Sequence, residues 1–164
     1  MRQNSVWAAM VIAAALLEAT WPQALSLQRV VPDLIVVLVV YFSIAEGAER
    51  GMYTGVLGGM FQDVAGNTGI GHHILCLVII GYVVGRMASR LITDNPYVKT
   101  VTVLLASMVH GILYLAVEYV QKVDMNALKM MSFSIVPQAC FTALLTPFVF
   151  LLVSRLRSTP IQGT

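Results

Sequence analysis

Long apolar stretches separated by short polar breaks follow one another along almost the whole chain. Six of them cover about residues 6–25, 30–45, 51–65, 73–91, 100–119 and 133–156. Each stretch is apolar over about 15 to 25 residues, whereas the strands of a membrane barrel alternate over only about 10. The pattern therefore predicts an all-α chain with six helices.

The stretches differ in length. A helix needs about 20 residues to cross about 30 Å of hydrocarbon, and segments 30–45 and 51–65 are shorter than that. Such helices recruit flanking residues or thin the bilayer locally, and segment 51–65 could instead form a re-entrant hairpin shielded by protein. Segment 6–25 resembles a signal peptide, but we interpret it as an uncleaved helix because it lacks a clear small-x-small cleavage site.

The overall composition indicates whether these helices lie in water or in a lipid bilayer. The 164 residues are 58% hydrophobic and 11% charged, with a mean hydropathy of +0.81, whereas soluble domains are about 45–50% apolar and about 25% charged. This excludes a soluble globular domain and a disordered chain. The net charge of +2 without a basic stripe predicts no nucleic-acid partner. We expect one polytopic membrane domain over residues 1–164, a bundle of six transmembrane helices in the lipid bilayer.

The basic residues predict the orientation of the bundle, because cytoplasmic loops carry an excess of Lys and Arg. With the N-terminus inside, seven basic residues lie on the cytoplasmic side, namely Arg2, Arg50, Arg86, Arg90, Lys99, Arg155 and Arg157. The outer side then receives three, Arg29, Lys122 and Lys129. Both termini are therefore expected in the cytoplasm.

The same orientation collects polar side chains near the outer face. Those that we group as the outer polar cluster are Glu18, Asp33, Asp63, His72 and His73. Asp33 follows Pro32 and also fits a plain helix start, with Arg29 as a possible ion-pair partner. Glu18 and Asp63 are harder to explain in this way, because an ionisable side chain inside a span costs at least ~2.5–3.5 kcal/mol unless it is paired or hydrated. For these two, a packing network, a binding role and a hydrated helix end remain open.

Glycines recur every four residues in and before the third segment, and the regular set ends on Asp63. Residues four apart share one side of a helix, and small residues there let two membrane helices approach closely. We define the glycine seam as Gly51, Gly55, Gly58, Gly59, Gly81 and Gly85. Its partner is either another helix of this chain or a helix of another protein.

We find no combination of side chains in the sequence that forms a catalytic pattern. Asp63, His73 and Cys76 are too few for convincing zinc ligation, and Cys140 adds no disulfide framework. His110 stands alone in an apolar segment, where a histidine usually bonds to a neighbouring helix. The chain lacks a GxSxG serine and a phosphate-binding loop. We therefore expect no enzymatic activity, no cofactor and no metal site.

Several motifs together resemble one known family. They are Pro32-Asp33-Leu34, Gly51-x3-Gly55-x2-Gly58-Gly59-x3-Asp63, Gly66-x2-Gly69-x-Gly71-x-His73 and Gly81-Tyr82-x2-Gly85-Arg86. Their order and spacing resemble the central signature of the MreD family of rod shape-determining proteins. The motifs cover about residues 30 to 90, and the rest of the chain agrees by length and hydropathy.

The resemblance implies a non-enzymatic subunit of the cell-elongation machinery in the bacterial inner membrane. It implies contact with the transmembrane helix and juxtamembrane region of MreC, in an assembly with MreB, RodA and its partner transpeptidase. It also implies a fold similar to the substrate-binding subunits of energy-coupling-factor vitamin transporters. The alternative function is therefore a small-molecule-binding subunit of such a transporter, with an outward-facing pocket near Glu18, Asp33, Asp63 and His73.

Overall fold

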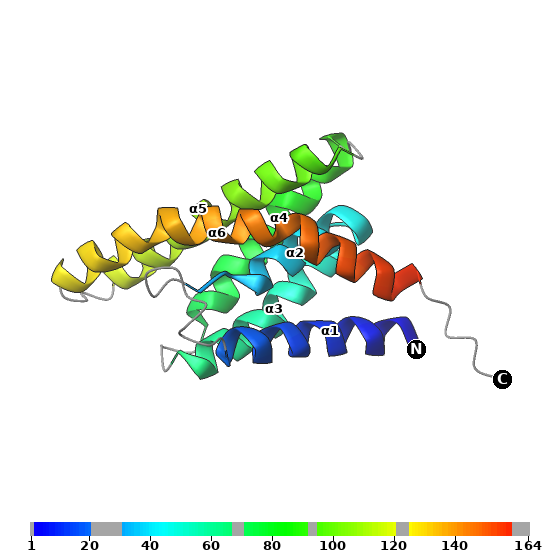
Figure 1. The fold of residues 1–164 in the computed structure, drawn as a ribbon. Coiled ribbons are helices and arrows are strands. Elements are labelled where there is room, and N and C mark those ends of the chain that lie inside the picture. The colour runs from blue at the N-terminus through cyan, green and yellow to red at the C-terminus, as the bar shows by residue number, and fades with distance from the viewer. Residues whose placement is uncertain (1, 21–30, 67–70, 92–94, 121–124, 159–164) are drawn as a thin grey trace.

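A computed structural model describes residues 2–20, 31–66, 71–91, 95–120 and 125–158 of the chain (Figure 1). These residues form six α-helices, and the prediction of an all-helical chain is confirmed. The helices are α1 (Arg2–Ala19), α2 (Leu34–Glu46), α3 (Ala48–Ala65), α4 (His72–Leu91), α5 (Pro96–Val120) and α6 (Met125–Ser158).

Some helix ends differ from the expected ones. Helix α2 begins at Leu34 rather than near residue 30, because Asp33 caps it and accepts a hydrogen bond from the Val36 N–H at 3.0 Å. Pro32 therefore precedes the cap instead of occupying the first helical position. Helix α6 begins at Met125, ahead of residue 133, because hydropathy marks only the apolar part of a helix. Residues 21–25 of the first predicted segment lie outside the described residues.

Helix α2 is the centre of the fold. It packs against every other helix of the described part, and Figure 1 shows it in the middle of the bundle. Its buried residues lie all around its axis, as expected for a helix that other helices surround. They are Leu34, Ile35, Val36, Val37, Leu38, Val39, Val40, Phe42 and Ser43.

The turn between α2 and α3 consists of Gly47 alone. Its φ of +92° and ψ of −179° lie in a region that is open almost only to glycine. The chain therefore reverses at once, and α2 and α3 pack side by side. Helix α3 then continues without a break from Ala48 to Ala65, which rules out a hairpin within the third segment.

Two described helices are long and apolar enough to cross a bilayer on their own. Their apolar stretches are Pro96–Val117 and Phe133–Leu156, and the mean hydropathy of each is 1.9. Shorter apolar helices cover Asn4–Ala19, Leu34–Glu46 and His72–Ala88. The amino end of α1 and the carboxyl end of α6 lie on the same side of the bundle (Figure 1).

Candidate functional site

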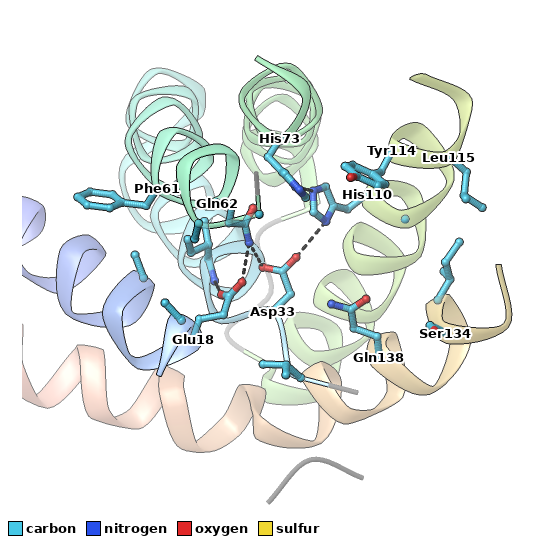
Figure 2. A pocket seen from close by; sticks show the side chains of 18 residues that line it. Glu18, Asp33, Phe61, Gln62, His73, His110, Tyr114, Leu115, Ser134 and Gln138 are labelled. Atoms are coloured by element: carbon cyan, nitrogen blue, oxygen red, sulfur yellow. Dashed lines mark hydrogen bonds and ion pairs between the residues drawn. The ribbon is translucent and has the colours of Figure 1, made fainter. Parts of the chain in front are cut away.

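A cavity of about 690 Å³ lies beyond the amino end of α2, and residues of all six helices line it. It exists because α2 begins late, so that the neighbouring helices extend past its first turn. Figure 2 shows the labelled polar side chains around this space, with Glu18 and Gln62 on one side and His110 and Gln138 on the other.

Glu18 comes from the last turn of α1 and completes the start of α2. Its Oε2 accepts hydrogen bonds from the backbone N–H groups of Leu34 at 3.1 Å and Ile35 at 3.4 Å. The first N–H groups of a helix lack partners within the helix, and a carboxylate is stabilised there by the helix dipole. This carboxylate therefore joins α1 to α2.

Asp33 connects α2 to two further helices in addition to capping it. Its Oδ2 lies 2.9 Å from Nδ1 of His110 in α5. Its backbone N–H donates to the Thr142 hydroxyl in α6 at 3.0 Å. Asp33 is 2% exposed, so the helix-start interpretation describes only part of its role. Arg29, the expected ion-pair partner, lies outside the described residues.

Gln62 in α3 bridges the two carboxylates. Its Nε2 donates to Oε1 of Glu18 at 2.8 Å and to Oδ1 of Asp33 at 3.1 Å (Figure 2). Its other amide atom, Oε1, is buried and has no hydrogen-bond partner among the residues that the structure describes. The bridge holds the two acidic groups together and leaves one acceptor of Gln62 enclosed by the protein.

Two histidines continue the network from α2 towards α4. Nε2 of His110 lies 3.4 Å from Nδ1 of His73, and the His73 ring stacks on Tyr114 with 4.6 Å between the ring centroids. Asp33, His110 and His73 therefore form a continuous chain across three helices (Figure 2). His72 is buried in the first turn of α4 and is not among the residues that line the cavity.

Asp63 holds the beginning of α4 and also lies outside the cavity lining. Its Oδ2 accepts a hydrogen bond from the Gly71 N–H at 2.7 Å, and its Oδ1 accepts one from the His73 N–H at 2.9 Å. The structure thus divides the outer polar cluster. Glu18, Asp33 and His73 line the cavity, whereas Asp63 caps a neighbouring helix.

The glycine seam lies between α3 and α4, with one branch towards α2. A Cβ atom on Gly55 would lie 2.8 Å from the Leu77 backbone, and one on Gly59 would lie 2.6 Å from the Ile74 backbone. From α4, Gly81 meets the backbone of Gly51, and Gly85 meets that of Ala48. Gly58 faces the Ile35 side chain of α2. The close approach is therefore between helices of one chain.

Three residues of the network were absent from the sequence-based site. Gln62 follows Gly58 by four residues, so it shares the side of α3 that faces α2, and this spacing could have identified it. His110 was expected to bond to a neighbouring helix, but its partner was not predictable. Thr142 carries no signal in the sequence that points to Asp33.

The comparison with known families agrees with these motifs. The model of the family described as rod shape-determining protein MreD matches residues 1–156. No curated protein matches the chain. The match covers nearly the whole chain, including the glycine seam and all the acidic residues around the cavity, and the family is one of shape determination rather than a known enzyme family. The chain therefore belongs to the MreD family of rod shape-determining proteins.

Proposed function

We propose that the chain is a non-enzymatic, multi-pass subunit of the bacterial inner membrane that binds MreC and helps to position peptidoglycan synthesis during cell elongation. The observation that carries this proposal is the family match over residues 1–156. MreB, RodA and its partner transpeptidase are the further members of the proposed assembly. The family match gives no support to the vitamin-transporter alternative.

The proposed arrangement in the membrane is a single domain of six spans, with both termini in the cytoplasm and a fold like that of the energy-coupling-factor binding subunits. The asymmetry of the basic residues supports this orientation. The positions of the ends of α1 and α6 on one side of the bundle support an even number of crossings (Figure 1).

The partner helix needs a face other than the glycine seam, because the helices of this chain already fill that seam. Helix α1 offers such a face. Val6, Ile12 and Leu16 are exposed along it, and Ala9 and Ala13 are exposed one helical turn apart. Small residues at this spacing allow close contact between membrane helices. We place the transmembrane helix of MreC along Ala9 and Ala13 of α1.

Co-purification from native membranes tests this docking face. We expect Ala13→Leu to reduce the amount of MreC that co-purifies with the tagged chain by about tenfold, equivalent to about 1.4 kcal/mol. The matched control is Ala116→Leu, which changes an exposed alanine of α5 and should leave the yield of MreC unchanged. Equal losses in both variants would contradict the α1 face. Absence of MreC from the wild-type preparation, together with normal rods after depletion of the chain, would contradict the proposed function itself.

A further inference from the structure

We propose that His73 and His110, which we call the histidine pair, form a switch that takes up one proton through the cavity beyond the amino end of α2 and then holds α5 more tightly to α2. Three helices meet at the pair, because Asp33 caps α2, His110 belongs to α5 and His73 belongs to α4. Histidine is the side chain whose charge ordinarily changes between about pH 5 and pH 8.

The hydrogen atoms of the neutral pair have one arrangement that uses every contact. The Asp33 carboxylate already accepts hydrogen bonds from the Val36 N–H and the Gln62 amide, and an ionised carboxylate only accepts. Nδ1 of His110, 2.9 Å from Oδ2 of Asp33, therefore carries a hydrogen atom. A neutral imidazole has one N–H and one acceptor nitrogen. Nε2 of His110 is thus an acceptor, and Nδ1 of His73 donates to it across 3.4 Å.

An added proton needs no movement of either ring. Both rings line the cavity, and His73 is the more exposed of the two, since His110 is only 7% exposed. The proton binds to Nε2 of His73, the nitrogen atom that the pair does not use. The hydrogen atom between the rings then passes from Nδ1 of His73 to Nε2 of His110. His110 ends as an imidazolium beside the Asp33 carboxylate, and His73 ends neutral with its hydrogen atom on Nε2.

A second proton does not fit the pair. With both rings charged, Nδ1 of His73 and Nε2 of His110 would each carry a hydrogen atom and would face each other across 3.4 Å. Two positive charges this close oppose each other, and neither nitrogen atom would remain an acceptor. We therefore expect the pair to hold one proton where two separate histidines would hold two.

The surroundings of the pair are acidic on balance. The titratable groups that face it from the helices packed around it are Glu18 of α1, Asp33 of α2, Asp63 of α3, His72 of α4 and Tyr114 of α5. The α6 residues at the cavity, Ser134, Ile135 and Gln138, are uncharged, and the lining contains no Lys or Arg. Asp33 bonds to His110 directly, and Asp63 accepts from the backbone N–H of His73. These carboxylates compensate the charge of one bound proton.

The bound proton changes a contact between α5 and α2. Helix α5 packs mainly on α6 and less extensively on α2 and α4, so a buried bond between α5 and α2 has a large share in holding them together. Protonation converts the N–H of His110 that Asp33 accepts from a neutral donor into a charged one. Charge-assisted hydrogen bonds are roughly twice as strong as neutral ones. The proton therefore tightens this junction, and its loss loosens it.

Nitrogen NMR of the wild-type chain in detergent micelles, with labelled histidine rings, tests the proton count without any variant. The nitrogen shifts distinguish an imidazolium from each of the two neutral tautomers. We expect His110 to become an imidazolium as the pH falls from about 8 to about 5, while His73 stays neutral and its hydrogen atom moves from Nδ1 to Nε2. Protonation of both rings in this range, protonation of neither, or a charge that stays on His73 would overturn the proposal.

Hydrogen-exchange mass spectrometry, with rates corrected for their intrinsic dependence on pH, tests the effect on α5. We expect wild-type amides around Gly111 to exchange about fivefold more slowly at the lower pH, equivalent to about 1 kcal/mol. His110→Gln should remove this difference, because its amide still donates to Asp33 but takes up no proton. The matched control His72→Gln changes a histidine outside the cavity lining and should retain it. A wild-type chain without the difference, its persistence in His110→Gln or its loss in His72→Gln would contradict the switch.

Discussion

Each carboxylate around the amino end of α2 or α4 is bonded to backbone N–H groups at the start of a helix. Glu18, in α1, accepts a hydrogen bond from the first turn of α2, and Asp63, in α3, accepts hydrogen bonds from backbone N–H groups at the start of α4. The sequence could indicate the depth of these acids, because helix order and loop charge determine it. It could not indicate their partners, since these depend on how α1, α3 and α4 approach one another.

Substitution of Asp63 tests its capping role. Asp63→Asn removes one of two acceptor oxygens, and Asp63→Ala leaves the N–H groups of both Gly71 and His73 without a protein partner. We expect the alanine variant to lose about 2–4 kcal/mol in the free energy of unfolding, and the asparagine variant about 1 kcal/mol. Chemical unfolding in detergent micelles measures both, with Glu49→Ala as the surface control. Equal losses for the two Asp63 variants would show that hydrogen bonding is not the cause.

At the scale of the element, the regular glycine spacing indicated a close helix contact but left its partner open. The structure places that contact between α3 and α4, where Gly55 and Gly59 meet backbone atoms directly. A side chain can rotate away from an added methyl group, but backbone atoms cannot. The seam therefore fixes the separation of these two helices. A partner protein could bind to the seam only if α3 and α4 separated.

Bulkier residues at the seam should destabilise the chain even when no partner is present. We expect Gly55→Ala to lower the free energy of unfolding by about 1–3 kcal/mol, because a Cβ atom would overlap the Leu77 backbone, and Gly55→Leu to abolish folding. Met60→Leu changes an exposed residue on the same helix and serves as the control. The measurement is thermal unfolding of the chain in detergent. A Gly55→Ala variant as stable as Met60→Leu would contradict the internal seam.

For the whole molecule, the number of helices and their order were predictable from hydropathy alone. The first residues of α2 and α6 were not predictable from hydropathy. Helix α2 starts where Asp33 caps it, and α6 starts in polar sequence ahead of its apolar stretch. The cavity was not predictable either, although several residues that line it were. Its position depends on a short central helix among longer neighbours, and no local pattern encodes that difference.

Accessibility of introduced cysteines tests the orientation of the whole bundle. The background replaces Cys76, which is buried, and Cys140, which is exposed, with alanine. We expect Gly66→Cys to react with a membrane-impermeant maleimide in spheroplasts, and Asn95→Cys to react only after permeabilisation, because the distribution of basic residues predicts a cytoplasmic position for Asn95. Gel-shift labelling measures both sites. The reverse pattern would invert the proposed topology, and labelling of both sites in sealed spheroplasts would contradict it.

The short central helix also constrains how the chain is made. Helix α2 has 13 residues, about 20 Å at 1.5 Å per residue, and it exposes little of its surface to lipid. A segment of this length is a poor substrate for independent partition from the translocon into the bilayer. Because Gly47 alone separates it from α3, we expect the two helices to enter the bilayer as a pair. We therefore expect α2 to insert more efficiently when α3 has already been synthesised.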